Sequence, residues 1–314
     1  MKYPLSALAS ALALAFATIS AQAADNSVAT AQKGDGNIAY AEQSDAKGAK
    51  AAISQVGNNN KAGDAKNPGI FQKKSQDVEA QISQKGNENN AAIRQENSSQ
   101  STALVSQSGE QNAGTIRQDN DKKSKASLSQ EGKKNAATLE QQNVSDSQLT
   151  AKQSGADNKI AVKQLDSGHG IANIDQNGSQ NNAVATQTKV DFSEVNIKQS
   201  GNSNTAKATQ KDAQQVGSTI AQNGSDNNAL TEQSGKKNIS TINQKGNKNL
   251  TTLTQAGVGS ESLVSQNGYD NKAQVNQFGT GGKINYSSIA QSGNSYSANV
   301  TQHGSGNVVG IVQH

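Results

Sequence analysis

Small or apolar side chains alternate with polar ones in short stretches that recur along most of the chain. Before Gln199, for example, Ile197 and Val195 alternate with Lys198, Asn196 and Glu194. A period of two is typical of a β-strand that has one buried face and one solvated face. A helix would need apolar spacings of three and four, which these stretches lack. The pattern therefore predicts a succession of short strands.

A glutamine closes each stretch, and these glutamines recur every 11 or 12 residues from Gln32 to Gln313, except for intervals of 17 after Gln55 and 14 after Gln277. Such regularity indicates a repeat architecture. A buried Gln amide offers one acceptor and two donors, so stacked copies can satisfy one another. We predict an inward Gln ladder formed by Gln84, Gln95, Gln107, Gln118, Gln130, Gln141, Gln153, Gln164, Gln176, Gln187, Gln199, Gln210, Gln222, Gln233, Gln244, Gln255, Gln266, Gln277, Gln291 and Gln302.

Turns of two kinds separate the strands. In the first kind a glycine stands two residues after the glutamine, where it permits a positive φ and a tight reversal. We predict such turn glycines at Gly86, Gly109, Gly132, Gly155, Gly178, Gly201, Gly224, Gly246, Gly268 and Gly304. An asparagine three residues after the glycine is expected to form a second ladder, made of Asn89, Asn112, Asn135, Asn158, Asn181, Asn204, Asn227, Asn249 and Asn271. The second kind carries Asn or Asp in place of glycine and is one residue longer; from Gln233 onward the glycine form replaces it.

Composition limits the thickness of the core. Of the 314 residues, 32% are hydrophobic and 3% aromatic, and Trp is absent. Stacked rungs can build a thin core from Ala, Ser, Val and Ile. We therefore predict an all-β fold, a β-solenoid of stacked strand-turn-strand rungs of 22–23 residues with two facing parallel sheets. About twelve rungs and a half rung would span residues 24–314, with a loop insertion at about 63–69 that contains Pro68, because proline cannot donate to a sheet.

The first residues have the features of an export signal. Lys2 precedes an apolar stretch over residues 5–20, and a small-x-small site follows at residues 21–23. We predict a signal peptide over residues 1–23, cleavage between Ala23 and Ala24, and a secreted protein. No later segment is apolar enough to span a bilayer, and the chain has no Cys, so no disulfide is expected outside the cell.

The repeat resembles that of the curlin-repeat family, the subunits of bacterial curli fibres. The family pattern Ser-x5-Gln-x-Gly-x2-Asn-x-Ala-x3-Gln is carried in full by residues 193–210. The resemblance extends over about residues 26–313. It implies a functional amyloid: a cell-surface extracellular fibre, or fimbrium, that serves adhesion and biofilm matrix. The implied partners are other copies of the chain, a nucleator subunit, and an outer-membrane curli secretion pore with accessory proteins, reached through the periplasm.

Features of a catalytic or cofactor site are missing from the sequence. His169, His303 and His314 are far apart, and no serine has a nearby His and acid in a recognisable arrangement. The calcium-binding repeat Gly-Gly-x-Gly-x-Asp does not recur. We predict no enzyme and no cofactor. The net charge of +4 permits weak binding to acidic matrix polymers, but the sequence lacks aromatic platforms for specific nucleic-acid binding.

Alternative functions stay open at this point. The chain could be a minor or nucleator curli subunit rather than the major one. It could also be a monomeric solenoid binding protein for ice or polysaccharide, although its outward residues vary among Lys, Glu, Ser and Thr. A solenoid lyase or hydrolase would need larger coils and a local charged cluster. Fibre formation by the purified chain would separate these classes.

Overall fold

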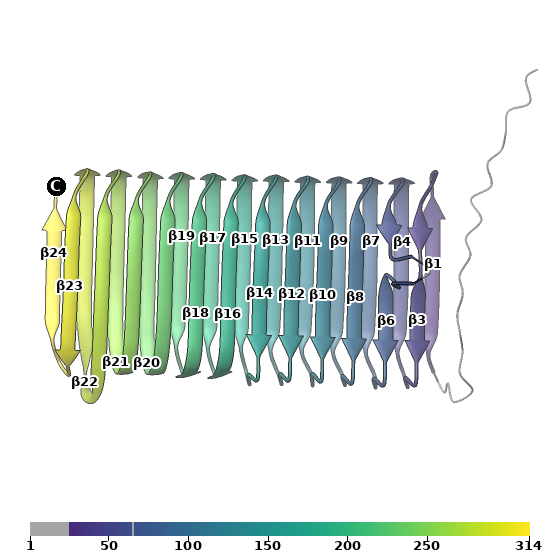
Figure 1. Cartoon of the computed structure of the whole chain (residues 1–314), viewed down its shortest axis with the longest axis horizontal. Helices are drawn as coiled ribbons and strands as arrows, with labels where there is room; N and C mark the ends of the chain where they lie inside the picture. The colour runs from purple at the N-terminus through teal and green to yellow at the C-terminus, as the bar shows by residue number, and fades with distance from the viewer. Residues whose placement is uncertain (1–24, 65) are drawn as a thin grey trace, which may run out of the picture.

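A computed structural model describes residues 25–64 and 66–314. The predicted signal peptide and its cleavage site, Ala23 and Ala24, lie outside these residues. The described chain coils into a long, flat stack of strands that run side by side across the long axis (Figure 1). Strands occupy 78% of the described residues, and these residues contain no helix that could cross a membrane. The predicted all-β solenoid, of about twelve turns, is confirmed.

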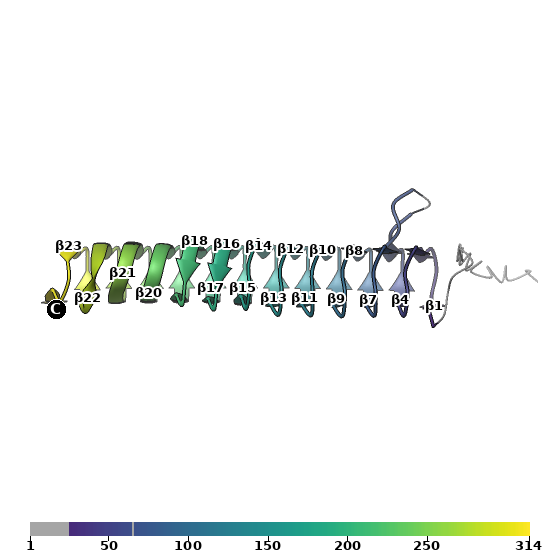
Figure 2. The same ribbon diagram turned by 90° about the horizontal axis from the view of Figure 1, so that it is seen from below.

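Two sheets face each other across a narrow interior (Figure 2). The first sheet contains β1 (Ser27–Lys33), β4 (Lys50–Asn58), β7 (Glu79–Asn87), β9 (Thr102–Glu110), β11 (Lys125–Lys133), β13 (Gln148–Ala156), β15 (Ile171–Ser179), β17 (Glu194–Asn202), β19 (Gly217–Ser225) and β24 (Val308–Gln313). The second sheet contains β2 (Ile38–Ala39), β3 (Ala41–Ser44), β5 (Lys61–Ala62), β6 (Ile70–Lys73), β8 (Asn90–Glu96), β10 (Ala113–Asp119), β12 (Ala136–Gln142), β14 (Lys159–Leu165), β16 (Asn182–Asp191), β18 (Thr205–Gln214) and β23 (Ser297–Gly304). Three long strands run through a turn and contribute to both sheets: β20 (Asn228–Asn247), β21 (Leu250–Tyr269) and β22 (Lys272–Asn294).

Pairing is parallel throughout the named strands, and glutamine pairs with glutamine along each sheet. In the first sheet, Gln107 of β9 pairs with Gln130 of β11, which pairs with Gln153 of β13. Each pass of the chain therefore pairs with the pass two further along, which lies 22 or 23 residues later except across the two longer intervals, where Gln55 pairs with Gln84 and Gln266 with Gln291. Because a slip of one residue would move every inward side chain to the outer face, the repeated alternation fixes this register.

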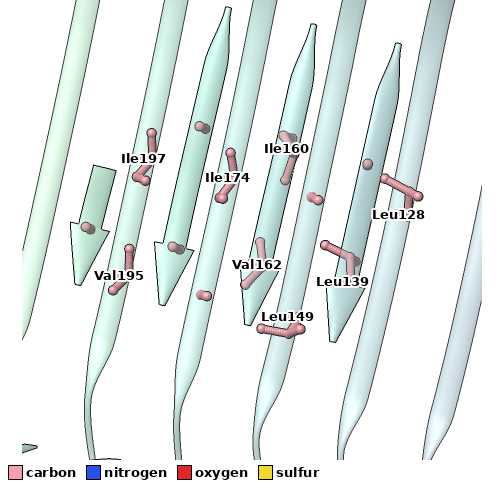
Figure 3. Close-up of a cluster of buried hydrophobic side chains, with 14 of the residues drawn as sticks. Leu128, Leu139, Leu149, Ile160, Val162, Ile174, Val195 and Ile197 are labelled. Carbon is pink, nitrogen blue, oxygen red and sulfur yellow. The ribbon is translucent and has the colours of Figure 1, made fainter. Parts of the chain in front are cut away.

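The interior is apolar along its centre. Leu128, Leu139, Ile174 and Ile197 are among the fully buried large side chains, and Figure 3 shows them pointing between the strands of the two sheets. Alanine often fills the inward position two residues before the larger side chain, as Ala103 does before Val105. Medium-sized and small side chains thus alternate at the inward positions. This alternation suits the short distance of about 10 Å between the facing sheets.

The longer turns build small arches at one edge of the solenoid. Their Asn or Asp, for example Asn97 and Asn120, adopts a positive φ, and so does the residue three positions later, such as Lys123. The arches end at β18, where Asp212 has no counterpart in β20 and the register shifts between Lys211 and Ala213. Beyond that point both edges carry the short glycine turn.

Two insertions account for the irregular intervals. Residues 63–69 lie between β5 and β6 and take the place of one residue of β8, because Ala62 aligns with Ala91 and Ile70 pairs with Ile93. The described residues of this loop, 63–64 and 66–69, project from the outer face of the second sheet (Figure 2). Pro68 lies in it, bridged to Gly63 and outside the named strands. The second insertion lengthens the turn within β22 between Thr280 and Asn285.

Candidate functional site

All twenty predicted ladder glutamines are buried. They form two hydrogen-bonded columns, one in each sheet. Glutamines on successive strands of the chain, which lie in opposite sheets, belong to different columns. In the first sheet each Nε2 donates to the Oε1 of the next glutamine, from Gln32 to Gln313, over 2.6–3.0 Å. A matching column runs from Gln43 to Gln302 in the second sheet. Both columns have the same polarity, with donors facing the C-terminal end.

Most of these amides also connect the two sheets. Nε2 of Gln107 donates to the carbonyl oxygen of Asn90 at 2.9 Å, and Nε2 of Gln130 donates to that of Ala113 at 3.0 Å. Each such glutamine therefore donates one Nε2 proton to the next glutamine of its column and the other to a backbone carbonyl of the facing sheet. A buried amide left without partners costs roughly 1–3 kcal/mol, so this double use stabilises both stacking and sheet-to-sheet contact.

The nine predicted asparagines form a third column beside the glycine turns, and all are buried. The side-chain and backbone nitrogens of Asn112 both donate to Oδ1 of Asn89 at 3.1 Å. Its Nδ2 also donates to the carbonyl oxygen of Gly132 in the following rung at 2.9 Å. Asparagine therefore ties each turn to the turns before and after it.

The turn glycines stack with almost no space between them. Gly155 has a φ of +111°, and a Cβ built on it would lie 2.0 Å from the carbonyl oxygen of Gly178. Most of the other predicted turn glycines show the same approach to the next glycine. A Cβ on Gly304, at the C-terminal edge, would meet only Nδ2 of Asn307, at 3.9 Å. The glycine column is thus required for close stacking as well as for backbone geometry.

One acidic side chain lies inside the arches. Asp121 is buried and its Oδ1 accepts a hydrogen bond from the backbone N–H of Val144 at 3.1 Å, while Oδ2 has no partner among the described residues. Burial raises the pKa of the Asp121 carboxyl to about 7, and the nearby charge of Asp119 adds to this increase. Ser98 occupies the equivalent position one rung earlier, with its hydroxyl accepting from the Asp121 N–H.

Catalytic groups do not converge in the part of the chain that the structure describes. His169 lies in an arch, where it contacts Asp191 and stacks on Phe192, and His303 stacks on Phe278 far along the solenoid. No cluster of His, Asp or Glu among these residues could hold a metal ion. The surface charges instead form ion pairs between neighbouring rungs, such as Lys163 with Glu140 at 3.3 Å.

The two ends of the described stack expose strand edges. Among residues 25–64 and 66–314, the outer edges of β1 and β3 and those of β23 and β24 pair with no strand. Val308 and Val312 of β24 are 74% and 65% exposed. Unpaired edges of this kind are templates for further strand pairing.

The sequence comparison agrees with this geometry. The family model described as the curlin associated repeat matches residues 217–246 and 246–279. A search of curated proteins finds no match to the chain. The two matched segments lie where both edges carry the short glycine turn, as at Gly224 and Gly235, whereas the preceding rungs have an arch at every second turn. Residues 217–279 therefore carry curlin associated repeats within a stacked solenoid fold.

Proposed function

We propose that this chain is a structural subunit of an extracellular, curli-like amyloid fibre. The observation that supports it most is the continuity of the ladders up to the strand edges. Nε2 of Gln302 donates to the carbonyl oxygen of Tyr286 across the interior, and Oε1 of Gln302 accepts from Gln277 in the rung before. A glutamine Oε1 in a further rung could accept the second Nε2 proton of Gln302. A second copy can supply the next rung through the same contacts that hold rungs together within one chain.

The role we propose is structural and not catalytic. Curlin repeats and a β-solenoid fit a curli-type subunit, and the side chains that the repeat preserves serve stacking. Adhesion and a biofilm matrix would follow from the fibre itself, which presents the variable outward residues at a regular spacing of about 4.8 Å. The exposed lysines would give weak, salt-sensitive attraction to acidic matrix polymers.

Export is the second part of the proposal. Cleavage between Ala23 and Ala24 would release a chain whose next strand starts at Ser27. Passage through an outer-membrane curli secretion pore, with accessory proteins and a nucleator subunit, would place polymerisation at the cell surface. Surface fibres in cells that have the pore, and their loss when the pore gene is deleted, would test this route.

Assembly is tested by diluting the chain from Ala24 out of denaturant and following thioflavin fluorescence and sedimentation. We expect fibres after a lag, and a shorter lag when fragmented fibres of the same chain are added. A chain that stays monomeric by size-exclusion chromatography at every concentration would contradict the proposal and would favour the monomeric binding protein. A minor or nucleator subunit would instead assemble without a lag and seed a different subunit more strongly than itself.

A further inference from the structure

We propose that successive copies in the fibre are related by half a turn about the fibre axis, so that β1 of one copy pairs with β23 of the preceding copy and β3 pairs with β24. This inference rests on the proposed function and specifies the contact that joins two subunits. It follows from the order in which the solenoid fills its two sheets.

Each pass of the chain pairs with the pass two further along, so the sheets are filled in turn. The last two passes are β23 in the second sheet and β24 in the first, and both pair with β22. The next strand position is therefore the free edge of β23. If β1 takes that position, β2 and β3 follow over β24 and the stack continues without a gap. If β1 sits on β24 instead, the position over β23 stays vacant.

The turns that meet at a half-turn junction have the same pattern. Residues 302–307 read Gln-His-Gly-Ser-Gly-Asn, and residues 32–37 read Gln-Lys-Gly-Asp-Gly-Asn. In both, the asparagine Nδ2 donates to the carbonyl oxygen four residues earlier, as from Asn307 to His303 and from Asn37 to Lys33. Without the half turn, the next turn along the same edge would be the arch that follows Gln43, which is one residue longer. Within the chain such a change of turn is accompanied by a register shift.

The side chains also fit. Gln302 would donate to Oε1 of Gln32 in the next copy, in the direction that both glutamine columns follow. Outward Ile38 would lie over Val308, so two exposed apolar side chains would cover each other. Residues 285–313 contain no Asp, Glu, Lys or Arg, so no like charges meet at the junction.

The chain has no cysteine, which makes disulfide mapping of this junction direct. A half-turn junction brings His303 next to Lys33 and Val312 next to Glu42 of the following copy. The alternative junction brings Val312 next to Ala31 and leaves a vacant strand position beside His303. Paired residues on adjacent parallel strands are close enough for a disulfide, whose Cα atoms lie about 4.4–6.8 Å apart. All of these positions face outward, away from the ladders.

In the experiment, two single-cysteine variants of the chain from Ala24 are mixed in equal amounts, assembled, oxidised and analysed on non-reducing gels. We expect disulfide-linked dimers, up to about half of the chains for random order of the two variants, from His303→Cys with Lys33→Cys and from Val312→Cys with Glu42→Cys. Dimers from Val312→Cys with Ala31→Cys would overturn the half turn while leaving the fibre intact. Fibres that link in none of the three mixtures would overturn the junction at these edges. Failure of the unsubstituted chain to form fibres would overturn the proposed function itself.

Discussion

Gln153 donates from Nε2 to Oε1 of Gln176 at 3.0 Å, joining β13 to β15 through the interior of the solenoid. The same Nε2 donates to the carbonyl oxygen of Ala136 in the facing sheet at 3.1 Å. One amide therefore holds together two rungs and two sheets. Lys152 and Asp175, one residue earlier in the same strands, pair in register but face outward.

Replacing Gln153 and Gln176 together by alanine should lower stability and slow assembly. The change leaves one proton of Gln130 Nε2, and Oε1 of Gln199, without a partner along the stack, at a cost of roughly 1–3 kcal/mol for each buried group. Guanidinium midpoints and thioflavin lag times measure the effect. The matched control, Lys152→Ala with Asp175→Ala, should change stability by less than about 0.5 kcal/mol. Equal lag times for the two double variants would refute the role assigned to the buried amides.

Gly155→Ala should be strongly destabilising, because the new Cβ would lie 2.0 Å from the carbonyl oxygen of Gly178 at a φ of +111°. Backbone strain alone is expected to cost about 1–3 kcal/mol, before the two turns separate. Gly217→Ala is the control, since a Cβ there meets nothing within 4 Å. Comparing the denaturation midpoints of the two variants tests the close stacking of the turns; similar midpoints would show that the turns separate freely.

Asp121 should make the fold less stable as the pH rises. Its carboxyl keeps its proton in the folded state up to a pKa of about 7, whereas an unfolded aspartate releases it near its ordinary value of about 3.9. The folded state binds more protons between these values, so stability falls from about pH 4 to pH 7 and levels off above. The shift corresponds to at most about 4 kcal/mol.

Asp121→Ser, which copies Ser98 in the preceding rung, should remove much of this dependence and stabilise the fold at pH 8. Denaturation midpoints at pH 5 and pH 8 measure it, with Asp146→Ser as the control because Asp146 lies in the next arch but is exposed. An unchanged difference between the two pH values in Asp121→Ser would exclude Asp121 as its source.

The loop over residues 63–69 should be the preferred site of protease cleavage in the assembled state. It projects from the sheet and replaces a single strand residue, and exposed loop tips are where nicking concentrates. Replacing the seven residues by one alanine, as at Ala92, should restore the 11-residue interval, keep assembly and abolish the early cleavage. Mass spectrometry of short digests locates the cuts; cuts spread evenly over all turns would contradict this placement.

Much of the fold could be predicted from the sequence, because the alternation and the glutamine spacing are local signals repeated many times. The side chains of Ser101, Ala103, Val105 and Gln107 are all buried, as their period of two indicates. Repetition also determines which strands pair, since only one register superimposes every glutamine.

Other features depend on distances that only the stacked structure gives. The hydrogen bond from Gln107 to Asn90 requires the spacing of the facing sheets, and the contact between Gly155 and Gly178 requires the height of one rung above the next. Asp121 stands in a run of polar turn residues and has no sequence signal of burial. The positive φ of Glu88 and its equivalents before each ladder asparagine was also missed, because these positions vary in sequence.

The central claim is that rungs of this solenoid continue from chain to chain as a cross-β stack, and X-ray diffraction from aligned fibres tests it most directly. Parallel strands perpendicular to the fibre axis should give a meridional reflection near 4.8 Å and an equatorial reflection near 10 Å. A reflection near 4.8 Å on the equator would place the strands along the fibre axis. That result, or the absence of both reflections from well-aligned fibres, would contradict assembly by rung stacking.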